Sequence, residues 1–260
     1  MPNFSRVECS EVPQMSSNAF QSYAEKVDAF VAGRPGYPAA LLAELPTAEF
    51  AIDLGAGTGI FTEFLALKAK RVLALEPVAA MAQRIPVDRV PNVEVAIGGA
   101  EAIPADSVSA DLVTAATAFH WFQYEKATAE IVRVLKPGGA LALTWNVRDN
   151  RVPWVAKFDA VMDSYRGDSP RPSTGKWRRI FDDARFRHLI SKHYGYTQPM
   201  PTSGIVDRAL STSFIAALPP TEQANVRQQI ESIIANEPTL AGKPQVAFPY
   251  VTELYLFERV

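Results

Sequence analysis

The sequence predicts an α/β fold in which helices cover both faces of a doubly wound, mostly parallel β-sheet. Apolar runs of strand length alternate with helical segments between residues 50 and 147, and the first run ends in a glycine-rich turn. Repeated βα units of this length indicate parallel strands joined by right-handed crossovers. With 260 residues, 48% of them apolar, the chain can bury one such core, so we expect a single domain over 1–260.

The core is expected to contain five strands, each a short apolar run. Their ranges are 50–54, 71–75, 93–97, 111–115 and 140–147. Helices are expected between them where apolar residues recur at helical spacing. These helices cover 60–70, 78–85 and 124–135, and Lys136-Pro-Gly-Gly139 ends the last of them.

The ends of the chain differ in texture from this core. Residues 1–17 resemble a flexible leader, and residues 18–46 contain two helical segments separated by the turn Arg34-Pro-Gly-Tyr-Pro38. Residues 148–260 are expected to hold a variable insertion and closing strands. The elements expected there are helices at 153–165 and 221–236, a loop at 167–175, and strands at 193–198 and 245–260.

Composition argues against several classes of partner. The net charge is -2 and the pI is near 6.0, so neither nucleic acid nor an anionic membrane is an expected partner. The basic segment at 176–179 is interpreted as the solvated face of a short helix. No apolar run approaches the ~20 residues of a membrane span, and a single cysteine, Cys9, fits a reducing compartment. We expect a cytoplasmic protein.

The glycine-rich turn after the first strand reads Asp53-Leu-Gly-Ala-Gly-Thr-Gly59. Ligands of open parallel sheets bind beyond the carboxyl ends of the strands, where glycine lets backbone amides approach closely. A dinucleotide-binding turn needs a third glycine where this chain has Ile60, and Asp53 would repel a diphosphate. The ligand should therefore carry a cation, and a nicotinamide-dependent oxidoreductase is the less favoured alternative.

The next two strand ends supply groups for a nucleoside. Glu76 lies about 20 residues beyond the turn, where an acid hydrogen-bonds the hydroxyls of a ribose, and Pro77 follows it. The thioether of Met81 is placed to lie against an adenine face. After the third strand, the amide of Ala100 and the carboxylate of Glu101 are placed to read the adenine edge.

Five segments in this order resemble class I S-adenosylmethionine-dependent methyltransferases of the small-molecule group that includes trans-aconitate methyltransferase. They are DLGAGTG, LEP, GGAEAIP, ADLVTAATAFHWF and VLKPGGALAL, and SYAEKVDAFVAGRPGYP resembles the N-terminal lid of those proteins. The resemblance implies a Rossmann-like sheet of seven strands with the last antiparallel. It also implies lid helices at 18–46 and a cofactor-binding core at 50–147.

The resemblance further assigns S-adenosylmethionine as the cofactor and gives roles to individual residues. Asp53 and the turn would hold its methionine part, Glu76 its ribose, and Met81 with Ala100 and Glu101 its adenine. The turn residues concerned are Gly55, Ala56 and Gly57, with Pro77 and Thr117 nearby in the cofactor site. Many relatives have Asp where Gly99 stands, so the adenine amine contact is either absent or moved to Glu101.

On the lid, Tyr23 and Arg34 are candidates to close over the cofactor. Arg34 either pairs with the methionine carboxylate or lies on the surface beside a proline turn. For the acceptor pocket, the candidates are Phe20, Tyr37, His120, Trp121 and Trp145.

Methyl transfer is an in-line displacement, so the protein must align the acceptor and, for some acceptors, remove a proton. His120 is the candidate general base because its ordinary pKa suits proton removal near neutrality. A shape-filling or hydrogen-bonding role for His120 is the other interpretation. No metal is expected, since His188 and His193 have no neighbouring ligands at metal-binding spacing.

The sequence therefore predicts a methyltransferase that acts on a small-molecule acceptor, by O-methylation of a carboxylate or hydroxyl. The alternative from another class is a protein that keeps S-adenosylmethionine without transferring its methyl group, or that uses it for other chemistry.

Overall fold

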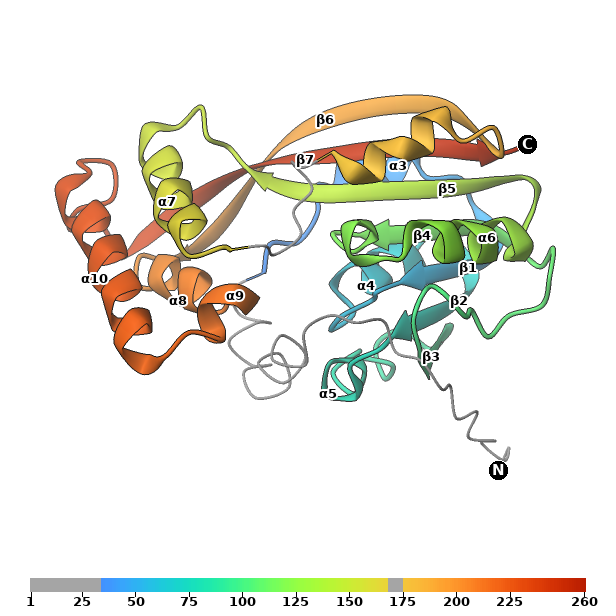
Figure 1. Cartoon of the computed structure of the whole chain (residues 1–260), viewed down its shortest axis with the longest axis horizontal. Helices are drawn as coiled ribbons and strands as arrows, with labels where there is room; N and C mark the ends of the chain where they lie inside the picture. Colours follow the sequence, from blue (N-terminus) through green and yellow to red (C-terminus); the bar gives the residue numbers. More distant parts are fainter. Residues whose placement is uncertain (1–33, 168–174) are drawn as a thin grey trace.

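The computed structural model describes residues 34–167 and 175–260, which form one seven-stranded sheet with helices on both faces (Figure 1). The strand order is β3-β2-β1-β4-β5-β7-β6. Strands β1 to β5 pair in parallel, whereas β7 is antiparallel to both β5 and β6. The expected doubly wound, mostly parallel sheet with an antiparallel last strand is confirmed.

The strands follow the chain in order. Their bounds are β1 (Ala48–Leu54), β2 (Ala69–Glu76), β3 (Val93–Ile97), β4 (Ala110–Ala116), β5 (Leu135–Arg148), β6 (Phe186–Pro201) and β7 (Gln245–Arg259).

The helices lie between the strands and after them. Their bounds are α3 (Ala39–Glu44), α4 (Ile60–Ala66), α5 (Ala79–Ala82), α6 (Tyr124–Val134), α7 (Pro153–Ser164), α8 (Gly204–Leu210), α9 (Ser213–Ala216) and α10 (Pro220–Asn236), with 3-10 turns η1 (Phe119–Trp121) and η3 (Lys176–Asp182).

The central strands form because their side chains are buried on both faces of the sheet. Parallel strands covered by helices read as nearly continuous apolar runs, as β1 does here. Ile52 and Leu54 of β1 pack in the core on one face with Ile131 of α6. Ala51 packs on the other face with Leu65 of α4. Successive side chains of β1 thus point to opposite faces of the sheet and contribute to two separate cores.

A third core lies away from the parallel strands, where β5, β6 and β7 extend beyond them (Figure 1). Helices α7, α8, α9 and α10, here called the helical cluster, share it. Phe158 of α7 and Ile230 of α10 are fully buried there with Phe248 of β7. The cluster therefore occupies the region for which the sequence predicts a variable insertion.

Several boundaries differ from expectation, and β5 begins at Leu135, which pairs with Ala110, rather than at 140. Strand β6 begins at Phe186, although the sequence predicts a strand only over 193–198. Most β6 side chains are exposed at the sheet edge, so no apolar alternation marks the strand, and pairing with β7 defines it. Helix α4 is shorter than the expected range 60–70 because Ala69 already pairs with β1. Helix α5 is shorter than the expected range 78–85, and Pro86 disfavours helical geometry in the residue before it.

Helices α8 and α9 have no counterpart in the sequence prediction. They contain seven and four residues, too few to show a helical period, and they are stabilised by packing in the third core. By contrast, the basic segment behaves as predicted. In η3, Trp177 is buried while Arg178 and Arg179 are exposed.

Several predictions fall outside the described residues. They are the leader at 1–17, the helix at 19–31 with Phe20 and Tyr23, and most of the loop at 167–175. Within residues 34–167 and 175–260, no helix is both long and apolar enough to cross a bilayer.

Candidate active site

A cavity of about 590 Å³ opens at the carboxyl ends of β1 and β4. From β1 the chain proceeds through β2 and β3 toward one edge of the sheet, and from β4 it proceeds to β5 toward the other edge. The space between β1 and β4 is therefore the topological switch point, where open α/β sheets bind ligands. The glycine turn and the ends of β2 to β4 form one wall. The helical cluster and the end of β5 form the other.

The glycine turn is held close to the segment after β4. Gly55 has φ +69°, and a Cβ atom there would lie 2.6 Å from the Cβ of Ala118. Gly59, with φ +88°, precedes the first turn of α4. Only glycine fits both the left-handed backbone and the close approach at position 55. The backbone of the turn therefore lines the cavity without a side chain at position 55.

Asp53 lies beneath this turn. Its side chain is only 1% exposed, and its two carboxylate oxygens accept hydrogen bonds from Thr62 Oγ1 at 2.7 Å and Thr114 Oγ1 at 2.8 Å. Burial raises the pKa of Asp53 to about 6, while these two hydroxyls oppose the rise. The carboxylate is thus fixed in place at the cavity, where a cationic ligand group would favour its charged form.

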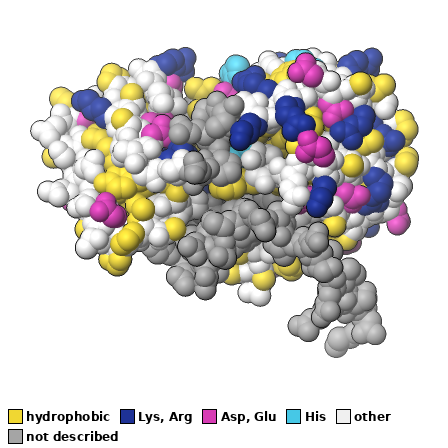
Figure 2. All heavy atoms as spheres, in the orientation of Figure 1, with side chains coloured by type: hydrophobic (Ala, Val, Ile, Leu, Met, Phe, Trp, Pro, Cys, Tyr) yellow, Lys and Arg dark blue, Asp and Glu magenta, His cyan; other side chains and the backbone are white. Residues whose placement is uncertain are grey.

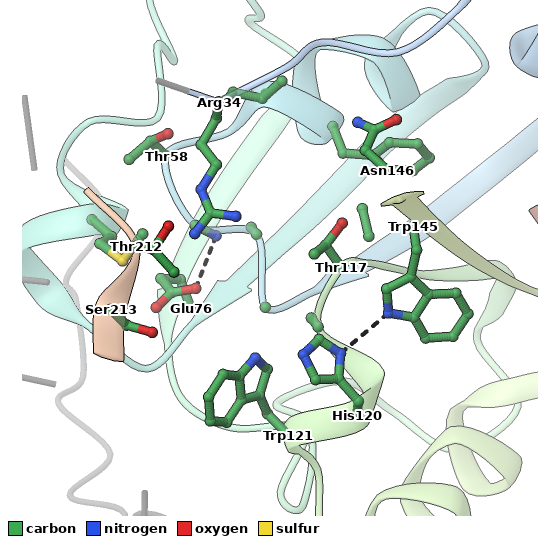
Figure 3. A pocket seen from close by; sticks show the side chains of 18 of the residues that line it. Arg34, Thr58, Glu76, Thr117, His120, Trp121, Trp145, Asn146, Thr212 and Ser213 are labelled. Carbon is green, nitrogen blue, oxygen red and sulfur yellow. Dashed lines mark hydrogen bonds between the residues drawn. The ribbon is translucent and has the colours of Figure 1, made fainter. Parts of the chain in front are cut away.

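Glu76 ends β2 beside the turn. One carboxylate oxygen accepts the backbone N–H of Gly57 at 2.8 Å and the other accepts that of Val78 at 2.9 Å. Burial raises the pKa of Glu76 to about 7, against the lowering effect of these amides. Each carboxylate oxygen retains a lone pair for a ligand hydroxyl. Figure 3 shows Glu76 facing the cavity below Arg34.

The nucleoside end of the cavity contains an unsatisfied acceptor. Glu101 Oε1 accepts the backbone N–H of Gln123 at 2.8 Å, whereas its buried Oε2 has no hydrogen-bond partner among the described residues. Met81 and Ala100, both buried, lie at the same end, as does Pro77. A buried oxygen without a donor fits an adenine amine, so these residues suit the base of S-adenosylmethionine.

The described part of the expected lid, from Arg34 onward, is tied to β5 and β6 through its backbone. Gln198 Nε2 donates to the carbonyl of Arg34 at 3.1 Å, and Asn146 Nδ2 donates to that of Gly36 at 2.9 Å. Tyr37 packs edge-on against Phe61, with ring centroids 4.8 Å apart, and burial raises its pKa to about 12. Arg34 and Tyr37 both line the cavity, as the sequence predicts.

His120 lies in η1, directly after β4. Its Nδ1 is 3.1 Å from the indole Nε1 of Trp145, which donates a hydrogen bond to it (Figure 3). Burial, with the charges of Arg34 and Arg166, lowers the pKa of His120 to about 3. Trp121 lies beside the imidazole with ring centroids 5.3 Å apart. Trp145 is fully buried and also lines the cavity beside His120.

Thr117 joins β4 to η1 in a strained conformation. Its φ is +57°, which is uncommon for a residue with a branched side chain, and its N–H donates to the carbonyl of Thr144 at 2.7 Å. Such strain persists where surrounding structure enforces it, often beside functional sites. Here it turns the chain so that His120 follows at the cavity wall.

The structure adds three arginines that the sequence analysis did not single out. Arg148 ends β5 and pairs with Asp159, and Arg166 pairs with Asp163 through Nε at 2.7 Å. The sequence gives little indication that these two arginines belong to a site, because they flank an expected helix and are part of no recognisable motif. The cavity thus carries two ion pairs on the wall opposite the glycine turn.

The third arginine is Arg208 of α8. It is 6% exposed and donates to Tyr250 Oη at 3.3 Å and to Thr212 Oγ1 at 3.4 Å. Within the described part of the chain it forms no ion pair with a carboxylate. Because α8 is not predicted from sequence, its approach to the cavity is a purely tertiary result. Sequence reasoning also missed Thr58, whose buried Oγ1 faces the cavity without a partner in the described residues.

The fold and this site together define a class of protein. A seven-stranded doubly wound sheet whose last strand, β7, is antiparallel, with a glycine turn after β1 and an acid at the end of β2, is a Rossmann-like methyltransferase fold, and S-adenosylmethionine is the cofactor of that fold. Residues 34–167 and 175–260 contain no cluster of three or more side chains suited to hold a metal ion.

Known proteins identify the same family. Residues 52–143 match the family described as methyltransferase domain. A methyltransferase-like protein of Schizosaccharomyces pombe is 34% identical over 88% of this chain and 92% of its own. A Mycobacterium tuberculosis methyltransferase is 31% identical over 89% and 93%. A type II methyltransferase structure from Anaeromyxobacter dehalogenans has a TM-score of 0.59 at 25% identity, covering 86% and 96%.

The chain therefore belongs to the methyltransferase family and is an S-adenosylmethionine-dependent enzyme. This excludes the nicotinamide-dependent alternative as its class.

Proposed function

We propose that the enzyme methylates an oxygen of a small acceptor molecule, either a carboxylate or a hydroxyl. The observation that carries the proposal is the arginine-bearing half of the cavity, where Arg208 lacks a carboxylate partner among the described residues. An uncompensated buried cation is costly, and an anionic group on the acceptor would neutralise it. The resemblance to the group that includes trans-aconitate methyltransferase supports the same acceptor class.

The two halves of the cavity have separate tasks. Asp53, Glu76 and Glu101 hold the cofactor, which supplies a methyl group already activated on a sulfonium. Arg208 and the neighbouring ion pairs hold the acceptor opposite it. Arg34, held at its backbone by Gln198, and Tyr37 border the cavity between the two halves. Catalysis then consists mainly of alignment, which requires few reactive side chains.

A nucleic-acid acceptor is not part of this proposal. On the face shown in Figure 2, lysine and arginine side chains are interspersed with acidic ones, without one continuous basic patch. The net charge of -2 also gives no general attraction for phosphate backbones. An acceptor small enough to enter the cavity is the better match.

The test is methyl transfer from methyl-labelled S-adenosylmethionine to a panel of matched small molecules. Glutarate, its monoamide and pentane-1,5-diol differ in the acceptor group at constant chain length. O-methylation of a carboxylate yields an ester that releases labelled methanol in alkali, and O-methylation of a hydroxyl yields an alkali-stable ether. Label found on nitrogen or carbon, with none on oxygen across a broad acid and alcohol panel, would contradict the proposal.

A second measurement separates acceptor choice from cofactor function. Calorimetry should show binding of S-adenosylhomocysteine that is lost on Glu76→Gln and kept on Glu63→Gln at an exposed ion pair of α4. Retained cofactor affinity with no transfer to any acceptor would favour the alternative of a protein diverted from methylation.

A further inference from the structure

The hydrogen-bond partner of His120, the indole of Trp145, can only donate. The indole N–H of Trp145 donates and has no lone pair to accept with, and it lies 3.1 Å from His120 Nδ1. Nδ1 must therefore present a lone pair. A neutral imidazole carries one proton, so in this arrangement the proton is on Nε2.

Trp145 cannot easily adopt another arrangement. Its side chain is fully buried, with its ring centroid 4.4 Å from that of Trp177 and 6.0 Å from that of Tyr255. A buried indole N–H left without an acceptor is destabilising. A proton on Nδ1 would impose that cost, so the core disfavours both the other tautomer and the imidazolium.

The charges around His120 act in the same direction. Arg34 comes from the lid segment and Arg166 follows α7, and both disfavour a positive imidazole. Two carboxylates, Asp159 and Asp163, line the same cavity as these arginines, and each is paired with an arginine. His120 is therefore neutral across the physiological pH range, and Nε2 has no lone pair with which to take a proton.

We propose that His120 serves as a hydrogen-bond donor to the acceptor through Nε2, with Trp145 as the positioning residue that fixes this tautomer. In Figure 3, the ring edge opposite the Trp145 contact faces the cavity. Rather than acting as a base, His120 orients an oxygen that is already deprotonated.

This inference rests on the proposed O-methylation and selects a carboxylate over a hydroxyl. A carboxylate oxygen forms the new bond to the methyl carbon while the carbon–sulfur bond breaks and leaves its electron pair on sulfur. The anion and the sulfonium become a neutral ester and a neutral thioether. No proton moves, so no base is required. The donor at Nε2 binds the second carboxylate oxygen and aligns the first.

The direct test is the tautomer itself, read by long-range proton–nitrogen NMR of the imidazole rings in the wild-type protein. His188→Gln and His193→Gln, at exposed sites on β6, assign the His120 signals by elimination. We expect Nε2 protonated and Nδ1 unprotonated, without change between pH 5 and pH 8. A protonated Nδ1, or titration within that range, would overturn the inference even if the enzyme proves active.

Variants test the positioning role. Trp145→Phe removes the indole N–H, so we expect His120 to populate both tautomers and the KM for a carboxylate acceptor such as glutarate to rise at least fivefold, with S-adenosylhomocysteine affinity within twofold. Trp177→Phe is the matched control, since it removes the neighbouring buried indole and should leave the tautomer unchanged. Equal tautomer changes in both variants would show a general packing effect and contradict the inference.

A substitution of His120 itself separates donor from base. His120→Gln can accept from Trp145 and still donate into the cavity, so it should retain carboxylate methylation within about tenfold, whereas His120→Leu should lose at least a hundredfold. A flat dependence of kcat on pH from 6 to 8 is expected for the wild type. Methylation of the diol in preference to the acid, with activity rising through a single ionisation and lost in His120→Gln, would assign the base role instead.

Discussion

Arg208 is the side chain on which the proposed acceptor half of the cavity most depends. It is buried on α8, and its described partners are the neutral groups of Tyr250 and Thr212. A charge-assisted hydrogen bond to an anion contributes about 1.5–3 kcal/mol, more than either neutral bond. The residue that determines acceptor binding is thus expected on the helical cluster, away from the conventional cofactor motifs.

Arg208→Met keeps an apolar stem of similar length and removes the charge. We expect the KM for an anionic acceptor to rise about 10- to 100-fold, which corresponds to the loss of one charge-assisted hydrogen bond. Cofactor affinity should stay within twofold. Steady-state kinetics with an acceptor from the labelling screen provide the measurement. Arg151→Met, at an exposed ion pair, is the control, and an equal effect in both variants would make Arg208 a structural residue.

At the scale of elements, two connections after parallel strands build the site together. The turn after β1 approaches Ala118 of the segment after β4 so closely that position 55 has no room for a side chain. Thr117 adopts a positive φ in the same segment. These two backbone features bring the glycine turn and the segment that carries His120 together at one side of the cavity.

Gly55→Ala should therefore disturb both walls. The left-handed conformation alone costs an alanine about 1–2 kcal/mol, and the contact at 2.6 Å requires one segment to move. We expect S-adenosylhomocysteine affinity to fall at least tenfold by calorimetry. Gly138→Ala is the matched control, since Gly138 has φ +76° with no atom within 4 Å of an added Cβ. It should lose stability and retain affinity; equal affinity losses would argue against the clash.

At the scale of the molecule, the site joins two cores. The parallel strands supply the cofactor wall, and the helical cluster supplies Arg208 and the ion pairs. A hydrogen-bonded path connects them, from Arg208 through Tyr250 and Gln198 to the backbone of Arg34. This path ties the helical cluster to the backbone of Arg34 at the cavity.

Burial of carboxylates at this junction affects the stability of the whole protein. Burial raises the pKa of Glu76 to about 7, well above its value of 4.5 in an unfolded chain. The folded state then binds more protons than the unfolded state between these values. This contribution favours folding at low pH and is lost as pH rises through about 7.

Glu76→Gln should remove that dependence. From pH 5 to pH 8, the unfolding free energy of the ligand-free wild type should fall relative to the variant by about 2 kcal/mol. Denaturant unfolding at both values of pH measures the difference. Glu63→Gln controls for the loss of one exposed carboxylate. If the difference in unfolding free energy between wild type and Glu76→Gln were the same at both values of pH, burial would not raise the pKa of Glu76.

Local pattern predicted the cofactor half because its signals lie within short segments. Asp53, the glycine turn and Glu76 follow apolar strands directly, and parallel strands bring their carboxyl ends to one edge. The same logic located His120 after β4, but its protonation state depends on Trp145, which is 25 residues away. The sequence left the base role and the hydrogen-bonding role of His120 open, because local pattern does not show that Trp145 lies beside it.

The sequence by itself determined the parallel core of the sheet through apolar periodicity, and its motifs, through the family that they resemble, determined the cofactor. Only the tertiary structure decided the acceptor half, since Arg148, Arg166 and Arg208 meet there through the packing of the helical cluster. Contacts between segments far apart in the chain depend on three-dimensional packing, and that packing leaves no local period in the sequence.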